Sequence, residues 1–233
     1  MALAIAVPQA RVIALDRSDR GGLAAACEAA LCKVLERVDA VLVGPGLAAD
    51  DASVGLARWL VARCAELPRP PGVVLDAAAL AAVSHRDVRL PVLVTPHAGE
   101  MASLTGLDKS AVIAHADRIA RDAAQHWQAV VALKGAQTSI AAADGRAWRH
   151  ACSIPGLAMS GSGDVLAGVI AGLAARGATL EQAACWGVVL HAQAAQHLAQ
   201  RIGAIGFLAR ELADAIPAVL EDNRGSAAQS VHG

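Results

Sequence analysis

The segment Val92-Leu93-Val94-Thr95-Pro96-His97-Ala98-Gly99-Glu100 sets the pattern of the whole chain. Its three consecutive apolar residues predict a strand that is buried on both faces, as strands of parallel sheets are. The turn Thr95-Pro96-His97 ends this strand, and a helical pattern follows from Gly99 to Gln125, with a break near Gly106. A buried strand, a turn and a helix form one βα unit, so the segment predicts an α/β fold.

The same pattern recurs on both sides of this segment. Apolar runs typical of buried strands also occur at Val12 to Leu15, Ala40 to Val43, Val73 to Leu75 and Val130 to Leu133. Helical patterns separate several of them, at Ser53 to Cys64 and at Ala77 to Val83. Repeated βα units favour an open, mostly parallel central sheet with helices on both faces.

Turn residues follow four of these runs at the end where each strand stops. They are Gly44-Pro45-Gly46, Asp76, Thr95-Pro96-His97 and Lys134-Gly135-Ala136. The carboxyl ends of parallel strands lie along one edge of a sheet, where ligands bind, so we expect these residues to converge. Taken alone, the two glycines are equally well explained as a tight turn, and His97 as an ordinary surface histidine.

A glycine-rich segment, Ser160-Gly161-Ser162-Gly163-Asp164, runs directly into a strongly helical stretch. Small residues let several backbone N–H groups point into one cavity, and the positive end of the helix dipole adds to their attraction for an anion. We therefore predict a phosphate cradle. A carboxylate at its mouth is suited to accept a proton from a substrate hydroxyl, although Asp164 could also serve only as a helix N-cap.

Composition limits the classes of partner. The chain has 233 residues, 55% of them apolar, which suits one folded domain of ordinary size. Its 20 basic and 21 acidic residues are interspersed, so nothing indicates a nucleic-acid or membrane surface. The five cysteines lack a metal-site or disulfide spacing and no targeting segment is recognisable, so we expect a cytoplasmic protein with a small-molecule partner.

The remaining sequence predicts a hairpin and then helices. Thr138 to Ala142, the turn Asp144-Gly145 and Ala147 to His150 form the hairpin. Thr179 and Gln182 form a capping box that opens a helix to about Ala199, whose His191 and His197 we interpret as packing or interface residues. A last helix covers Leu208 to Leu220. We predict one domain over residues 1–221 and a disordered tail over 222–233.

Together these motifs resemble those of one enzyme family. Gly44-Pro45-Gly46-Leu47, Asp76 to Leu80, Thr95 to Glu100, Leu133 to Thr138 and the glycine loop ending in Asp164 occur in the order and spacing found in the ADP-dependent NAD(P)H-hydrate dehydratases. These are carbohydrate-kinase-like repair enzymes of the ribokinase-like superfamily. The resemblance implies a three-layer sandwich with a mostly parallel central sheet.

The resemblance also implies an activity and a site. Such enzymes use ADP, or ATP in some members, to phosphorylate the ring hydroxyl of NADHX or NADPHX and then eliminate phosphate, with Mg²⁺ as cofactor. Asp164 would be the catalytic base and would bind NADPHX together with Gly46 and His97. The anion hole would be Ser160, Gly161, Ser162 and Gly163. The adenine nucleotide would contact Gly163 and the segment Lys134, Gly135, Ala136, Gln137 and Thr138. No metal ligands are predicted from the protein itself.

The family resemblance further implies a homo-oligomer, a tetramer or larger, and an epimerase acting in the same pathway. Some positions depart from the family pattern: Ala78, Ala98, Ile154 and Met159 replace an acidic residue, a proline, an asparagine and a threonine. The resemblance begins only around Ala2 to Leu15, so we expect roughly the first strand and helix of the family domain to be absent.

Two other functions are compatible with the same motifs. A small-alcohol or vitamin-precursor kinase of the superfamily would keep Asp164 and the cradle but would need a different pocket around His97. The second is a nucleotide-binding or structural remnant that has lost catalysis with its N-terminal elements, and intact Lys134, Gly163 and Asp164 argue against full decay. The element Thr95 to Glu100 favours the dehydratase over the kinase.

Overall fold

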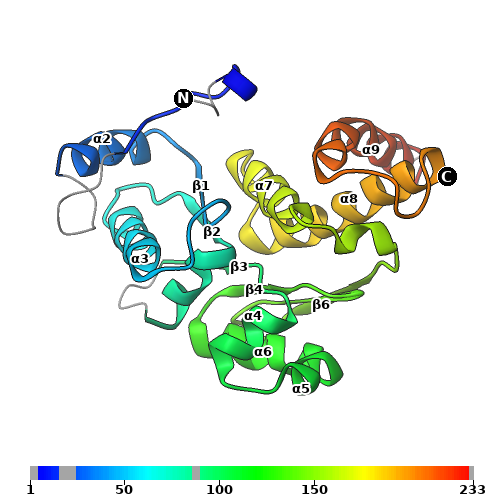
Figure 1. Cartoon of the computed structure of the whole chain (residues 1–233), viewed down its shortest axis with the longest axis horizontal. Helices are drawn as coiled ribbons and strands as arrows, with labels where there is room; N and C mark the ends of the chain where they lie inside the picture. Colours follow the sequence, from blue (N-terminus) through cyan, green and yellow to red (C-terminus); the bar gives the residue numbers. More distant parts are fainter. Residues whose placement is uncertain (1–4, 16–24, 86–89, 231–233) are drawn as a thin grey trace.

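The structure of the protein, a computed structural model, describes residues 5–15, 25–85 and 90–230 (Figure 1). Within these ranges the chain forms one six-stranded sheet whose spatial order follows the sequence. Its strands are β1 (Ala40–Val43), β2 (Gly72–Leu75), β3 (Val92–Val94), β4 (Val130–Leu133), β5 (Gln137–Ala141) and β6 (Ala147–Ala151). The first four are parallel, and β5 and β6 are antiparallel, as the predicted hairpin requires.

Helices cover both faces of the sheet because successive strand residues point to opposite sides. Val73 and Leu75 of β2 belong to a core that includes residues of α3 (Asp51–Ala65), the 3₁₀ helix η1 (Ala77–His85) and α6 (Ala116–Trp127). Val74 faces the opposite core, formed with α7 (Ser162–Ala175) and α8 (Leu180–Arg201). The predicted three-layer α/β arrangement is confirmed.

The long helical pattern after β3 is divided twice. It forms α4 (Ala98–Thr105), α5 (Lys109–Ala114) and α6. Gly106 ends α4 in a left-handed conformation with φ 73°, which confirms the predicted break. A second division at His115, which lies between α5 and α6, was not predicted.

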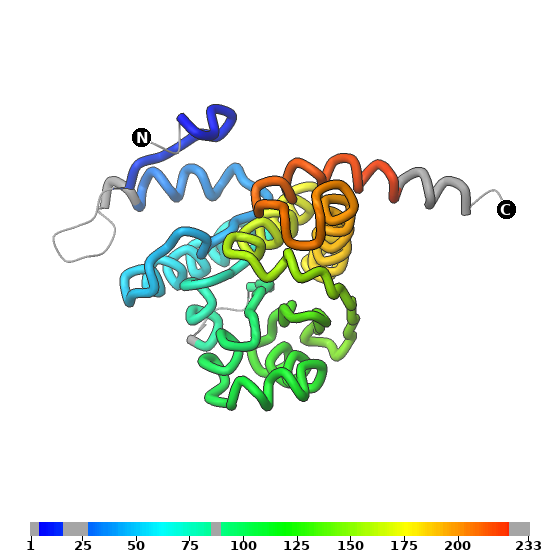
Figure 2. Tube along the Cα trace, turned by 45° about the vertical axis from the view of Figure 1, so that its right-hand side comes forward, coloured from blue at the N-terminus to red at the C-terminus, as the bar shows by residue number. Residues whose placement is uncertain are grey.

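Three helices pack together at the other side of the sheet. Figure 2 shows α8 lying beside α7 and beside the start of α9 (Ala209–Ser230). A third apolar cluster joins them, with Leu190, Phe207 and Leu212 among its buried members. The predicted capping box at Thr179 opens α8.

The predicted frayed tail is wrong for residues 222–230, which continue α9 to Ser230. A tertiary contact explains part of this extension: the Asn223 amide donates to the Gln193 side chain at 2.8 Å and to the Val219 carbonyl at 2.7 Å. Residues 231–233 lie outside the described residues.

The predicted strand at Val12 to Leu15 is also wrong. Residues 11–15 have no regular structure, and Val12 and Leu15 are 39% and 38% exposed. Strands are stabilised by pairing with a neighbour, and no described strand pairs with this segment. An apolar run alone therefore did not specify a strand. Upstream of β1 the chain forms α2 (Ala25–Leu35).

Two further findings concern the described residues. No helix among them is both long and apolar enough to cross a membrane. The cysteines described with their side chains, Cys32, Cys64, Cys152 and Cys185, are free thiols, and of these four Cys64 is buried.

Candidate functional site

The ends of the parallel strands converge as predicted. His97 forms a parallel bridge with Lys134, and the Lys134 backbone N–H donates to the Pro96 carbonyl at 2.8 Å. The Asp76 N–H donates to the Val43 carbonyl at 3.0 Å, which joins the end of β2 to the end of β1. Main-chain hydrogen bonds thus hold the turns after neighbouring strands in a fixed relation.

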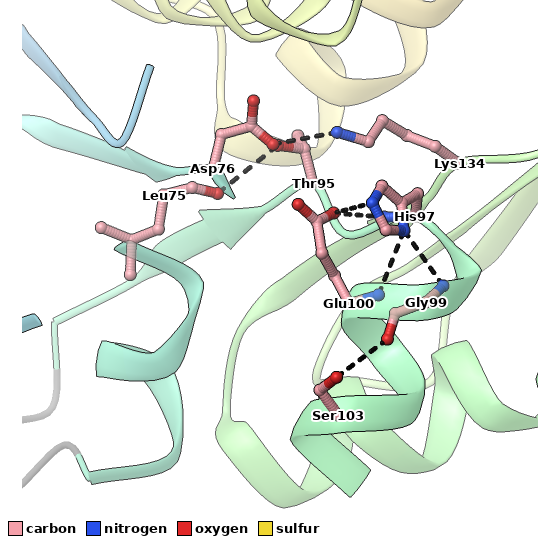
Figure 3. A network of polar contacts seen from close by, with 8 residues as sticks. All are labelled: Leu75, Asp76, Thr95, His97, Gly99, Glu100, Ser103 and Lys134. Atoms are coloured by element: carbon pink, nitrogen blue, oxygen red, sulfur yellow. Dashed lines mark hydrogen bonds and ion pairs between the residues drawn. The ribbon is translucent and has the colours of Figure 1, made fainter. Parts of the chain in front are cut away.

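A buried ionic network lies at this edge (Figure 3). Lys134 Nζ is 2.9 Å from Asp76 Oδ1, and the Thr95 hydroxyl donates to the same oxygen at 2.7 Å. The Asp76 side chain is 3% exposed and that of Lys134 is 18% exposed. A buried carboxylate is stable only when paired and hydrogen-bonded, and Asp76 has both kinds of partner.

The glycine loop lies against this network. Gly161, with φ 85°, is the N-cap of α7, so a residue with a side chain would be strained there. A Cβ built on Gly163 would lie 3.2 Å from Lys134 Nζ, which places the backbone of Gly163 close to the ammonium group. The N-terminus of a helix and a lysine therefore face the same region, an arrangement suited to an anion.

Asp164 does not cap the helix. The N-cap is Gly161, and Asp164 is an exposed residue of the first turn of α7. The interpretation of Asp164 as an N-cap is therefore wrong. A carboxylate in the first turn is stabilised by the helix dipole and, being exposed, remains accessible to a ligand.

Ser162, the first residue of α7, contacts a histidine that sequence analysis assigned to packing. His191 Nε2 of α8 lies 3.0 Å from the Ser162 carbonyl oxygen and 3.2 Å from its Oγ. Both residues are buried. Burial, with a smaller effect of the Lys134 charge, lowers the pKa of His191 to about 4, so its ring is neutral near pH 7.

His97 both caps α4 and exposes its ring. Its Nδ1 accepts hydrogen bonds from the N–H groups of Gly99 and Glu100 at 3.0 and 3.1 Å. The Glu100 carboxylate accepts in return from the His97 N–H at 2.7 Å, which confirms the capping role considered for Glu100. Because Nδ1 accepts, the hydrogen of the neutral ring is on Nε2, and the side chain is 60% exposed.

The two glycines of the turn after β1 differ. Gly44 has φ 133°, and a Cβ there would lie 1.8 Å from the Asp76 carbonyl oxygen, so only glycine fits. Gly46 has φ 79° and follows Pro45 in a turn closed by a 2.9 Å hydrogen bond from the Leu47 N–H to the Gly44 carbonyl. A Cβ on Gly46 would have no neighbour within 4 Å, so this position is open.

The segment predicted to bind nucleotide, residues 134–138, is exposed in its middle and buried at its end. Gly135 and Ala136 form the exposed turn between β4 and β5, and Gln137 is the exposed first residue of β5. Thr138 is buried within β5 and is paired with His150 of β6. Lys134 is the residue of this segment that reaches the loop at Gly163.

Asp76 and Thr95 were placed at this edge by the sequence, because each directly follows a buried strand, but the bonds of Asp76 to Thr95 and to Lys134 were not predicted. The contact of His191 with Ser162 was not predicted either. Nothing in the sequence links His191 to Ser162, which is 29 positions away.

A model of the NAD(P)H-hydrate dehydratase family matches residues 3–218. The chain belongs to this family. It is 41% identical over 221 residues to an ADP-dependent (S)-NAD(P)H-hydrate dehydratase of Xanthomonas campestris pv. campestris, a match that covers 94% of this chain and 74% of that protein.

Solved structures of related proteins have a similar fold. The ADP/ATP-dependent NAD(P)H-hydrate dehydratase of Bacillus subtilis, co-crystallised with ATP and Mg²⁺ and soaked with CoA, superposes with a TM-score of 0.71 at 31% identity, over 79% of this chain and 66% of that one. A ribokinase-like superfamily protein of Enterococcus faecalis gives a TM-score of 0.75 at 26% identity, over 95% and 72%. The predicted ribokinase-like fold is thereby confirmed.

Proposed function

We propose that this chain catalyses the ADP-dependent dehydration of NADHX and NADPHX to NADH and NADPH, a lyase reaction. The observation that carries the proposal is the placement of an exposed carboxylate, Asp164, in the first turn of a helix whose N-terminus lies against Lys134. Family membership supplies the substrate class.

The chemistry accounts for this arrangement. Hydroxide is a poor leaving group, whereas phosphate is a good one. The ring hydroxyl oxygen attacks the terminal phosphorus of ADP, the bond to the bridging oxygen breaks, and AMP leaves. Asp164 takes the hydroxyl proton during this step. Loss of phosphate, together with a proton from the neighbouring ring carbon, then restores the double bond.

Each side of the loop has a proposed role. The backbone N–H groups from Ser160 to Gly163 would stabilise charge on the transferring phosphoryl group, at about 3 kcal/mol for each well-placed donor. Lys134 to Thr138 would contact the adenine nucleotide. On the other side, His97 Nε2–H would donate to the hydrated nicotinamide, and the open turn at Gly46 would leave room for it.

The described residues fit Mg²⁺ held chiefly by the nucleotide. They contain no group of three His, Cys, Asp or Glu side chains that could hold a metal, so the nucleotide phosphates would supply most of the ligands, beside the exposed carboxylate of Asp164 next to the cradle. Mg²⁺ commonly binds one or two carboxylates together with substrate phosphates. When bound, it would neutralise charge on the diphosphate.

The broader setting is proposed on the same basis. We infer that the chain acts as one domain, predicted to end at residue 221 and extended by the rest of α9 to Ser230. We also infer that the protein works in the cytoplasm as a homo-oligomer and that an epimerase supplies the reactive epimer of the hydrate. Size-exclusion chromatography with light scattering would measure the oligomeric state.

The decisive experiment is a repair assay on purified protein with NADHX and either ADP or ATP. Formation of NADH, AMP and phosphate in equal amounts from ADP is the expected result. Asp164→Asn should lower kcat by roughly 10²- to 10⁴-fold, because the base is lost while the fold is kept.

Asp122→Asn is the matched control, because Asp122 is an exposed carboxylate on α6, which carries none of the site residues. Repair by Asp164→Asn at the rate of Asp122→Asn would overturn the assignment of the base. A stable phosphorylated product without NADH would indicate a kinase. Nucleotide binding without any reaction would indicate a remnant.

A further inference from the structure

We propose that His191 is a positioning residue for the glycine loop. Its Nε2–H holds Ser162 by a hydrogen bond to the Ser162 carbonyl oxygen, and the hydroxyl proton of Ser162 stays available to donate to a bound phosphate group. The proposal rests on the proposed function only in taking the loop as a phosphate site. The proposal gives the Ser162 and His191 side chains a part in phosphate binding, in addition to the backbone N–H groups of the cradle.

Hydrogen-bond chemistry fixes the state of the His191 ring. A carbonyl oxygen can only accept, so the 3.0 Å contact between Nε2 and the Ser162 carbonyl oxygen requires a hydrogen on Nε2. The same N–H lies 3.2 Å from Ser162 Oγ and can be shared between the two oxygens. The hydroxyl proton of Ser162 is therefore not used by His191.

The position of Ser162 indicates what that proton is for. Ser162 is 4% exposed and is the first residue of α7, and its side chain does not cap the helix. Among the described residues, His191 is the hydrogen-bond partner found for its hydroxyl. A buried hydroxyl with an unused proton is costly unless it donates to something, and the adjoining loop is shaped for an anion.

The charges around His191 keep the ring in this role. Burial, followed by the nearby Lys134 ammonium group, disfavours a second proton on the ring and lowers its pKa to about 4. Lys134 also lies against Gly163. His191 therefore holds the loop without adding a cation, and the cation beside the cradle is Lys134, which is paired with Asp76.

The test measures binding of ADP and of inorganic pyrophosphate by calorimetry, with thermal unfolding of each variant. His191→Leu replaces the imidazole with an apolar side chain that has no donor, and should weaken binding of both ligands about tenfold. His191→Gln keeps a neutral N–H donor and should bind within about threefold of wild type. Ser162→Ala should weaken binding about fivefold.

Val188→Ala is the packing control, since Val188 is a buried residue of the same helix. It should lower the unfolding temperature without changing affinity for either ligand. The double variant His191→Leu/Ser162→Ala should bind about as weakly as the worse single variant. Both changes remove the same contact, the one between the positioned Ser162 hydroxyl and the phosphate group, so their effects should not add.

Three results would overturn the proposal: wild-type affinity in folded His191→Leu, equal losses in His191→Gln and His191→Leu, or a wild-type protein that binds neither ADP nor pyrophosphate. If His191→Leu does not fold, the comparison of His191→Gln with Ser162→Ala decides, and unchanged affinity in Ser162→Ala counts against the proposal. Nucleotide binding without NADHX repair would contradict the proposed function alone.

Discussion

The edge of the sheet that carries the site has a buried half and an exposed half. In the buried half, Asp76, Thr95 and Lys134 bond to one another. In the exposed half, Asp164 lies in the first turn of α7 and His97 presents its ring above α4. Both halves are made of polar groups at the same edge. The groups of the first half are bonded to one another, whereas the second half leaves the Asp164 carboxylate and the His97 ring exposed, although His97 also caps α4 through Nδ1.

This difference separates Asp76 and Thr95, which are bonded within the protein and shape the site, from Asp164 and His97, which are exposed to a ligand. Lys134 belongs to both groups, because it pairs with Asp76 and also lies against the glycine loop. A buried polar group without a partner is costly, so the buried half must be complete before any ligand binds. Exposed groups are satisfied by water, which a substrate can displace. Changes in the buried half should therefore affect stability, and changes in the exposed half should affect repair.

The largest expected effect on stability comes from Asp76→Ala. The change leaves the Lys134 ammonium group and the Thr95 hydroxyl without their shared acceptor, and we expect a loss of about 3 to 5 kcal/mol in the free energy of unfolding. Urea unfolding measures it. Asp39→Ala is the control, because its partner Arg69 has an 88% exposed side chain and such pairs contribute below about 1 kcal/mol. If Asp76→Ala and Asp39→Ala lose the same free energy of unfolding, the bonds of the buried half do not stabilise the protein more than an exposed ion pair does.

A second test uses the pH dependence of stability. The folded pKa of His191 is about 4, below the ordinary histidine value of 6.5, so the unfolded chain binds the proton first as the pH falls. The free energy of unfolding should therefore fall between pH 6.5 and 4, by up to about 3 kcal/mol, and this contribution should level off below pH 4.

Urea unfolding at a series of pH values measures this dependence. His191→Gln cannot titrate, so its curve should lack this part of the slope, while the contributions of the carboxylates remain in both proteins. Identical slopes for the two proteins would show that His191 is not held neutral in the folded state.

The positions of residues along this edge could be predicted from the sequence better than the bonds between them. Buried parallel strands have a simple apolar signal, and each is followed directly by its turn, so Gly46, Asp76, His97 and Lys134 could all be placed at one edge. Asp164 could be placed near a helix N-terminus in the same way. These predictions depend on local sequence and on one rule about parallel sheets.

The partners in the buried half depend on tertiary structure. Asp76 and Lys134 are 58 positions apart, and Ser162 and His191 are 29 apart, so neither pair has a local signal. The errors have the same origin. Val12 to Leu15 resembles a strand but pairs with no described strand, and the extension of α9 includes Asn223, which bonds to Gln193 on another helix.

The smallest expected effect on stability is at His97, where capping and ligand binding can be separated. Asparagine is among the best N-cap residues, so His97→Asn should keep the stability of α4, whereas His97→Ala should cost about 1 kcal/mol. Both variants lose the Nε2–H donor, so both should lower kcat/KM for NADHX by about tenfold, close to the loss of one hydrogen bond. Urea unfolding and the repair assay measure the two effects.

Glu100→Ala provides the reverse control. It removes the carboxylate that accepts from the His97 N–H and whose Oε2 also lies 3.7 Å from His97 Nε2, but it keeps the imidazole, so it should lower stability with a smaller loss of repair than His97→Asn. If His97→Asn repairs NADHX as fast as wild type, His97 only caps the helix. The substrate side of the site would then rest on Gly46 and Asp164. If Glu100→Ala lowers repair as much as His97→Asn, the capping box itself orients the His97 ring. In that case the imidazole keeps its Nε2–H but no longer directs it at the substrate, so it contributes no more to repair than an asparagine does.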